Sequence, residues 1–239
     1  IRIDEALERA DEYVNMKQQK ISTIENMLNS RGVTPLQQYH IYRQLFIEYQ
    51  PFQFDKAKET LERQLVIAKQ IASDSLQHCT MLDMAMLHTT AGFYLEADEI
   101  FAQIDTASLT LDQKVYWYDA RQKFLHDYQE YVTTSSIEVP DASQITRYQD
   151  RILEITSDDI PLNRHIRILR IIESRDFEKA YEENMAFIAS LDKTSRDYAV
   201  QTYWQGYICE NLDRAEELIK WWTESALCDI QGAIKDNAS

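Results

Sequence analysis

Glycine and proline are scarce in this chain, whose 239 residues include only four of each. Folds rich in β-strands need many turn residues, and phosphate-binding loops of the Rossmann and P-loop types need clustered glycines. Neither G-x-G-x-x-G nor G-x-x-x-x-G-K occurs in the sequence. The composition therefore excludes these nucleotide-binding loops and favours long helices joined by short connections. The length is sufficient for one large domain or two small ones.

The sequence has few cysteines and lacks long apolar runs. The three cysteines, Cys79, Cys209 and Cys228, show no C-x-x-C spacing, so the sequence predicts neither a disulfide framework nor a zinc site. No run of 18 apolar residues and no signal peptide is visible. Because the sequence does not begin with methionine and closes on a polar tail, we expect it to be a fragment of a longer protein.

Basic side chains are outnumbered by acidic ones, 25 against 40, which gives a formal net charge of −15. A negative field of this kind repels phosphate backbones. We therefore expect no nucleic-acid binding by this segment. The acidity names no other partner and most simply supports solubility.

The spacing of apolar residues predicts helices along the whole chain. Residues 1–32 read as one long N-terminal helix, with an apolar stripe from Ile3 to Leu28 and with Gly32 as its stop. Thr34 and Pro35 are typical of the N-cap and the first position of the next helix.

One local pattern recurs after this N-terminal helix. A helix meets a short break, then an aromatic residue or leucine, and then an alanine three positions later; in "AGFYLEA" the break holds Gly92. The aligned alanines are Ala57, Ala97, Ala180 and Ala215. A small side chain lets two helices approach closely, and a large one four residues later fills the groove toward the next repeat. The pattern predicts a series of helical hairpins.

The spacing of these alanines is typical of tetratricopeptide repeats, which are about 34 residues long. Ala97 and Ala180 are far enough apart for one more degenerate unit. The sequence therefore predicts an all-α, tetratricopeptide-like helical-hairpin solenoid with a right-handed superhelix. Residues 1–32 would cap this array, and residues 33–239 would form one continuous solenoid.

Motifs for catalysis, metal binding or cofactor binding are not found. The sequence contains no H-E-x-x-H, G-x-S-x-G or E-x-x-H metal pair, and its five histidines are spread along the chain. We therefore expect no catalytic residues, no metal and no cofactor. The basic residues Arg164, Arg167 and Arg170 would either bind an anion or pair with nearby carboxylates, and we favour pairing.

Aromatic residues are dense in three stretches, Tyr116–Tyr118, Tyr203–Tyr207 and Trp221–Trp222. Helix packing accounts for most of them, because aromatic side chains bury large areas. Neighbours on a helix point about 100° apart, however, so adjacent rings cannot all face the core. Some should reach a surface, where rings stack on sugars or anchor peptides.

We therefore predict a binding surface on the concave face of the array, lined by the first helix of each repeat. Its predicted ligand- or partner-binding residues are Arg43, Met86, Trp117, His165, Trp204 and Tyr207.

Two stretches also resemble a known family: "DEALERADEYVNMKQQKISTIENML" and "YHIYRQLFIEYQPFQFDKAKETLERQLVIA". They are similar to Bacteroidetes regulatory proteins with N-terminal tetratricopeptide regions, and the closing "LCDIQGAIKDNAS" resembles the same family. The resemblance implies a single-pass membrane sensor with an exported repeat region, a membrane helix, a coiled coil and a C-terminal regulatory domain. It implies that any output activity lies outside this sequence.

The first functional hypothesis is a non-catalytic sensor domain in the periplasm, part of an inner-membrane protein. Its partner would be a protein, a peptide or a small extracellular ligand, and it would meet the membrane only through residues downstream of this sequence. The N-terminal helix can cap the array or pair with a second copy, so a homodimer stays open. The alternative is a soluble cytoplasmic scaffold or peptide receptor. A carboxylate-based glycan hydrolase is a third hypothesis, although no carboxylate pair stands out.

Overall fold

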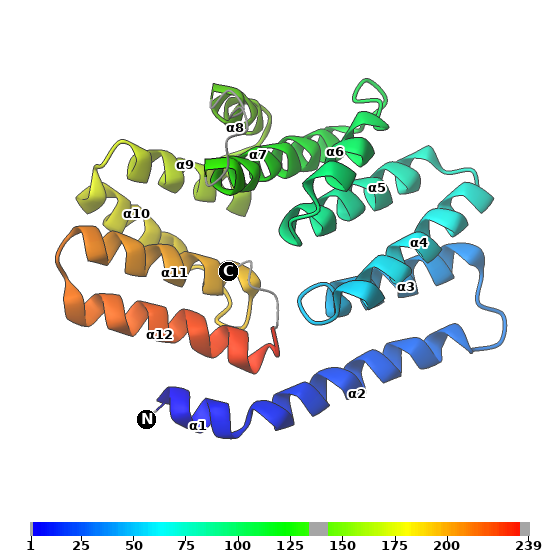
Figure 1. The fold of residues 1–239 in the computed structure, drawn as a ribbon, viewed down its shortest axis with the longest axis horizontal. Coiled ribbons are helices and arrows are strands. Elements are labelled where there is room, and N and C mark those ends of the chain that lie inside the picture. The colour runs from blue at the N-terminus through cyan, green and yellow to red at the C-terminus, as the bar shows by residue number, and fades with distance from the viewer. Residues whose placement is uncertain (1, 134–142, 235–239) are drawn as a thin grey trace. The chain divides into compact units, whose positions relative to one another are not determined.

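The structure, a computed structural model, describes residues 2–133 and 143–234, and these residues form α-helices joined by turns (Figure 1). No strand occurs in the described residues. The helices are α1 (Arg2–Glu8), α2 (Ala10–Leu28), α3 (Pro35–Tyr49), α4 (Phe54–Gln70), α5 (Asp74–Thr90), α6 (Tyr94–Ala102), α7 (Leu111–Thr133), α8 (Ser143–Ile155), α9 (Pro161–Glu173), α10 (Phe177–Ile188), α11 (Arg196–Asn211) and α12 (Ala215–Gln231).

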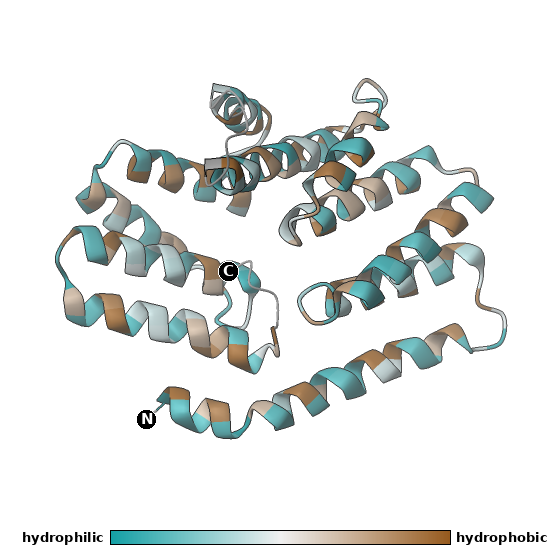
Figure 2. Ribbon diagram, in the orientation of Figure 1, coloured by the Kyte–Doolittle hydropathy of each residue, from teal (hydrophilic) through white to brown (hydrophobic). Residues whose placement is uncertain are grey.

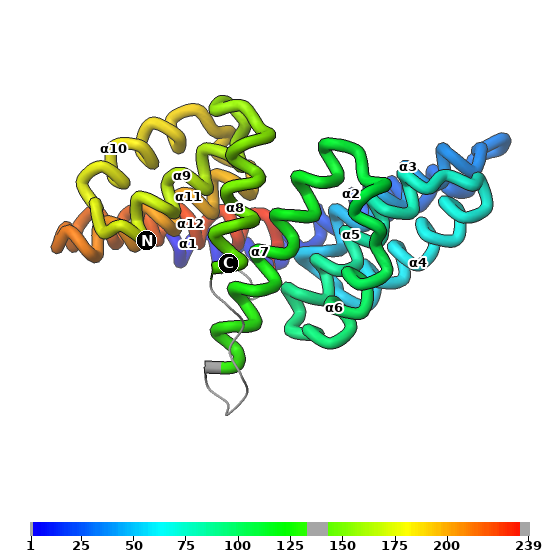
Figure 3. Tube along the Cα trace, turned by 90° about the horizontal axis from the view of Figure 1, so that it is seen from above, coloured from blue at the N-terminus to red at the C-terminus, as the bar shows by residue number. Residues whose placement is uncertain are grey.

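The helices pack as consecutive hairpins in two compact units, each described by itself. The central unit, residues 20–156, contains the hairpins α3–α4, α5–α6 and α7–α8. The split unit combines residues 2–19 with residues 157–234 and contains α9–α10 and α11–α12. Figures 1 and 3 show the paired helices side by side, and Figure 2 shows apolar and hydrophilic residues alternating along them. The prediction of an all-α, tetratricopeptide-like helical-hairpin solenoid is confirmed.

The N-terminal stretch is divided into two helices where the sequence predicted one. A turn at Arg9 separates α1 from α2. In α1 the buried residue is Ala6, whereas Leu7 of the predicted stripe is 55% exposed. α1 packs on α12 within the split unit, and Arg2 forms a salt bridge with Glu224. The role of residues 1–32 as a cap for the array stays a prediction.

The predicted start of α3 is confirmed in atomic detail. Thr34 is the N-cap and Pro35 follows it as the first helical residue. The Thr34 hydroxyl accepts a hydrogen bond from the Gln37 backbone N–H, and the Gln37 side chain accepts one from the Thr34 N–H. This reciprocal capping box satisfies two donors that the helix itself leaves unpaired.

Four further corners share one backbone geometry with the corner at Gly92. Gly92 adopts a left-handed conformation with φ +78°, and its N–H donates to the Thr89 carbonyl, 3.0 Å away. The Phe93 N–H donates to the His88 carbonyl at 2.9 Å, which completes a Schellman motif. The same two bonds recur where other residues take the left-handed position, namely Ala72, Arg175, Asp213 and Ala233. The corner is thus a recurring device that uses glycine only once.

This shared geometry corrects one of the four predicted helix crossings. Ala57, Ala97 and Ala180 are each 0% exposed, as expected at close helix crossings. Ala215 is exposed, because it is the first residue of α12 rather than a residue of its second turn. Counted from the left-handed residue of the corner, the position of α12 that is equivalent to Ala97 and Ala180 is Leu218. The Leu-x-x-Ala match in the sequence was therefore out of register by three residues.

Candidate functional site

Four aromatic side chains gather on the last hairpin of the split unit. Tyr203, Trp204 and Tyr207 lie on α11, and Trp222 lies on α12. The rings of Tyr203 and Trp222 are stacked with centroids 6.5 Å apart, and the Trp204 ring lies 5.9 Å from Tyr203 and 5.7 Å from Tyr207. Tyr203 is 42% exposed and Trp222 is 37% exposed. We call these four residues the α11 aromatic surface.

A glycine in the middle of α11 fixes the position of Trp222. A Cβ atom added at Gly206 would lie 2.2 Å from Cδ1 of Trp222 and 2.3 Å from its Nε1, which no real contact allows. The indole therefore sits directly on the backbone of α11, and its Nε1 donates a hydrogen bond to the Tyr203 carbonyl at 3.2 Å. Glycine inside a helix costs roughly 0.5–1 kcal/mol relative to alanine. The missing side chain gives the indole room to lie against the helix, and this contact keeps a partly exposed ring in one orientation.

A histidine–glutamine pair joins α9 to α11, the helix that carries three of these rings. Nδ1 of His165 lies 2.8 Å from the amide Nε2 of Gln201. Because the amide nitrogen donates, the ring nitrogen accepts, and the proton of the neutral imidazole is then on its Nε2. Burial lowers the pKa of His165 below its ordinary value, which favours this neutral form.

Behind this pair, buried amides bind α10 to α11. The Nδ2 of Asn184 donates to the Gln201 carbonyl at 3.0 Å and to Oε1 of Gln205 at 2.8 Å. Asn184, Gln201 and Gln205 are all buried. Hydrogen bonds of this kind specify the relative position of two helices, because an unpaired buried amide is costly. They link α10 to α11, the helix that carries three of the four rings of the α11 aromatic surface.

The predicted residue Arg43 belongs to a different cluster, in the central unit. Its Nη1 donates to Oδ2 of Asp83 at 2.9 Å, and the Tyr116 hydroxyl donates to Oδ1 of the same carboxylate at 2.8 Å. The three side chains come from the first helices of successive hairpins, α3, α5 and α7. The Asp83 side chain is 5% exposed and that of Arg43 is 43% exposed. We call these three residues the central relay.

Burial shifts the pKa values of two residues of the central relay, Asp83 and Tyr116. Burial raises the pKa of Asp83 above its ordinary value, although the Arg43 guanidinium and the Tyr116 hydroxyl both lower it. Burial, together with the adjacent Asp83 carboxylate, raises the pKa of Tyr116 well above its ordinary value. The tyrosine therefore stays a neutral hydrogen-bond donor over the physiological range, and the relay acts as a structural link.

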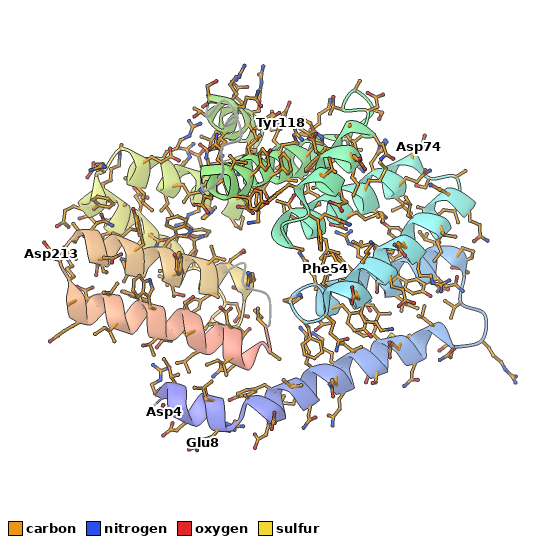
Figure 4. All side chains as sticks on the ribbon, viewed as in Figure 1. Asp4, Glu8, Phe54, Asp74, Tyr118 and Asp213 are labelled. Atoms are coloured by element: carbon orange, nitrogen blue, oxygen red, sulfur yellow. The ribbon has the colours of Figure 1, made fainter. Side chains whose placement is uncertain are left out.

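The remaining predicted residues of the central unit have packing partners. Met86 is 9% exposed and lies in the core cluster formed by α5, α6 and α7, so packing accounts for it. Trp117 is partly buried against the same core, and its ring contacts those of Tyr118 and Tyr148 edge-on at 5.4 Å each. Figure 4 shows Tyr118 on α7. The predicted set is thus divided between two units: Arg43, Met86 and Trp117 lie in the central unit, and His165, Trp204 and Tyr207 lie on α9 and α11 of the split unit.

The arginines of α9 are engaged by neighbouring side chains. Arg164 donates to the Ser190 hydroxyl at 3.1 Å and lies over the ring of Phe187. Arg167 donates to Asn163 and pairs with Asp158. The salt bridge of Arg167 agrees with the pairing that the sequence analysis favours.

A shallow depression of about 440 Å³ lies elsewhere, between α2 and α3. Its lining residues are Lys20, Thr23, Ile24, Gln44, Ile47 and Glu48. The salt bridge between Lys20 and Glu48 occupies part of this wall. The depression contains none of the predicted binding residues.

The described residues contain no group of three His, Cys, Asp or Glu side chains placed to hold a metal ion. All three cysteines are free thiols, and burial raises the pKa of Cys209 to about 11. Cys209 is therefore a core residue rather than a reactive nucleophile. None of the helices in the described ranges combines the length and apolarity that crossing a membrane requires.

Some residues of both clusters were missed by sequence reasoning. Asp83 and Tyr116 sit in the first helices of their hairpins, so projecting the repeat onto the chain could have placed them beside Arg43. Gly206 carried a signal as well, because a glycine inside a strong helical pattern marks a close approach. Gln201 carried none, since a helical glutamine is ordinarily solvated.

The consecutive helical hairpins define the class of the molecule: a helical-repeat domain of the tetratricopeptide type. A family model of the SusR N-terminal TPR domain matches residues 7–239, and the chain belongs to that family. The resemblance to Bacteroidetes regulators with an N-terminal tetratricopeptide region is thereby confirmed. A search of curated proteins finds no significant match to the chain. Domains of this type generally bind partners or ligands rather than catalyse reactions.

Proposed function

We propose that the chain is a non-catalytic sensor or interaction domain that binds its ligand or partner at the α11 aromatic surface. The observation that carries this proposal is the seating of Trp222 on Gly206, which holds a partly exposed indole in one orientation. A rigid aromatic side chain loses little entropy when it binds, so such residues dominate binding energies. Trp204 and Tyr207 belong to the same surface, and His165 bonds to Gln201 of the same helix, α11.

We further propose that this domain is the periplasmic part of a membrane-bound regulator. The family of the chain supports this proposal, because its members are regulators with an N-terminal repeat region. A ligand can change the state of such a regulator only if it binds two conformations with different affinities. The soluble cytoplasmic scaffold remains the alternative.

The α11 aromatic surface can be tested by thermal unfolding of this domain against panels of oligosaccharides and peptides. A ligand at about 100 times its dissociation constant stabilises the folded state by about 2.7 kcal/mol, which raises Tm by a few degrees. Trp222→Leu should abolish the increase in Tm. The matched control is Arg43→Ala, which alters the central relay and should keep it. Loss of the increase in the Arg43 variant alone would move the site to the central unit.

The periplasmic placement has its own test. Intact cells with a permeabilised outer membrane are treated with denaturant and a membrane-impermeant maleimide, and peptides that contain Cys79, Cys209 or Cys228 are read by mass spectrometry. Denaturant is needed because Cys209 is buried. We expect labelling. Thiols that react only after lysis of the inner membrane would instead support the cytoplasmic alternative.

A further inference from the structure

The hairpin that carries the α11 aromatic surface is strongly acidic. Between Arg196 and Gln231 it holds seven acidic and three basic side chains. Each basic side chain has a partner of its own: Arg196 pairs with Asp229, Arg214 pairs with Glu178 and Glu217, and Lys220 lies over the Trp221 ring. The positive charge of the hairpin is thus already engaged.

Three exposed carboxylates on the same hairpin carry no such partner within the described part of the chain. They are Glu210, Asp213 and Glu216, which surround the corner between α11 and α12. Figure 4 shows Asp213 at this corner. Their negative charge stands in water at one end of the hairpin and attracts cations.

The acidic corner and the aromatic surface are in register. Tyr203 and Glu210 are seven residues apart on α11, so they share one face of the helix at a spacing of about 10 Å along its axis. Tyr207 lies between them on the same face. On α12, Ile219 is 66% exposed one turn before Trp222, and it extends the apolar area. The hairpin therefore presents an apolar anchor region and, about two turns away, a negative one.

We infer that the partner of this surface is a basic protein segment. An apolar or aromatic side chain of the segment packs against Tyr203, Ile219 and Trp222, and a lysine or arginine about 10 Å away pairs with the acidic corner. Arginine also stacks on exposed tyrosine and tryptophan rings. This inference rests on the proposed function and names the partner class of the same site.

Charge complementarity selects this occupant over a second copy of the chain. The chain carries a formal net charge of −15, so two copies would bring like charges together at the acidic corner. A basic segment gains from the same field, which also accelerates its approach. Such binding should weaken as salt is added, because screening acts on the exposed carboxylates.

The test uses three synthetic 14-residue peptides that differ in one respect. Each is a helix-forming sequence with one tryptophan as the apolar anchor and, seven positions later or about 10 Å along the helix, two adjacent residues that are arginine, glutamine or glutamate. Binding to this domain is followed by the NMR signal of the Trp222 indole N–H and by calorimetry. We expect the arginine peptide to bind at least tenfold more tightly than the glutamine peptide, and the glutamate peptide to bind weakest.

Variants then separate the two halves of the surface. Glu210→Gln with Glu216→Gln should remove most of the preference for arginine, whereas Glu62→Gln, an exposed acid of the central unit, should leave it intact. Tyr203→Leu should weaken the binding of all three peptides. Circular dichroism checks that this variant is folded. Trp222→Leu serves as a second anchor variant in calorimetry.

The outcomes distinguish this inference from the proposed function beneath it. Equal affinity for the arginine and glutamine peptides, with the Trp222 signal shifted by both, overturns the basic partner and keeps the binding surface. If only oligosaccharides shift the Trp222 signal, the basic partner is likewise overturned and the binding surface is kept. If no peptide or oligosaccharide moves the Trp222 signal, the binding surface itself is wrong and the inference falls with it.

Discussion

The two units link their first helices by different chemistry. In the central unit, α3, α5 and α7 are joined by a charged relay in which Arg43 and Tyr116 both bond to the buried carboxylate of Asp83. In the split unit, α9 and α11 are joined by the neutral pair of His165 and Gln201 and by aromatic contacts. Within the same repeat architecture, the first helices of successive hairpins are thus joined by a charged link in one unit and by a neutral link in the other.

The difference supports the proposed binding surface on α11. In the central relay the hydrogen-bonding capacity of Asp83 is taken up by groups of the same chain, which makes it a structural link. On the α11 aromatic surface the rings of Tyr203 and Trp222 contact each other and are still about two-fifths exposed. Exposed, rigid aromatic area is what an interface uses.

The largest expected effect comes from breaking the central relay. Asp83→Ala leaves the buried Tyr116 hydroxyl and one arm of Arg43 without their acceptor, so we expect a loss of about 2–3 kcal/mol in the free energy of unfolding. Urea unfolding measures it through the midpoint at constant m-value. Glu62→Ala, an exposed acid in the middle of α4, is the control and should be near neutral. A cost below ~1 kcal/mol would mean that the relay does not hold the three helices together.

The second effect comes from filling the space under Trp222. Gly206→Val places a side chain where the indole now lies, so we expect a loss of about 1–3 kcal/mol together with a change in tryptophan emission as the ring is displaced. The double variant with Trp222→Ala isolates the cause. In that background valine should cost far less, because the clash has gone. An unchanged cost would show that Gly206 serves the helix for some other reason.

Much of the fold follows from residues that sequence patterns identify. Thr34 and Pro35 mark the start of α3 through backbone chemistry that is local to a few residues, whereas α2 ends at Leu28, before the predicted stop at Gly32. Ala57 and Ala97 can also be identified from the sequence. Each lies in the second helix of a hairpin that packs against the first helix of the same hairpin, which is close by in the chain. Such features need no knowledge of the distant chain.

The errors arise where distant contacts decide the outcome. Ala215 matched the corner pattern, but its hairpin is packed through Gly206 of the preceding helix, and the small residue therefore lies on the other side of the crossing. Leu7 fitted the N-terminal stripe, yet α1 turns Ala6 inward because it packs on α12, more than 200 residues away in the chain. Projecting an ideal repeat onto the chain placed Met86 on the surface. The repeats of this chain are degenerate, and an ideal repeat does not describe how each of their helices is rotated about its axis.

A third, smaller effect tests the shared corner geometry. Gly92 and Arg175 both have left-handed backbones, with φ of +78° and +62°. Gly92→Ala meets no atom within 4 Å, so its expected cost of about 1 kcal/mol is conformational alone. Arg175→Gly should stabilise by up to about 1 kcal/mol, since it relieves the same strain. Thermal unfolding measures both, and shifts of equal sign would contradict the shared-corner interpretation.

The smallest effect is a pH dependence that belongs to the split unit. The folded chain holds His165 at a lowered pKa, while the unfolded chain takes up a proton near pH 6.5. Its contribution to stability is therefore complete above about pH 6.5 and decreases as the pH falls toward the folded pKa. Between pH 7 and pH 6 the decrease is at most about 0.7 kcal/mol for one proton.

His165→Gln should remove this part of the pH dependence, because glutamine does not titrate and can still bond to Gln201. His126 acts in the opposite direction: its hydrogen bond with Asp127 raises its pKa, so its contribution is lost as the pH rises. Both proteins contain His126, so the difference between their urea unfolding curves at pH 6 and pH 7 isolates His165. Parallel pH profiles would mean that His165 is solvated in the folded chain, and the neutral link between α9 and α11 would then have to come from the aromatic contacts alone.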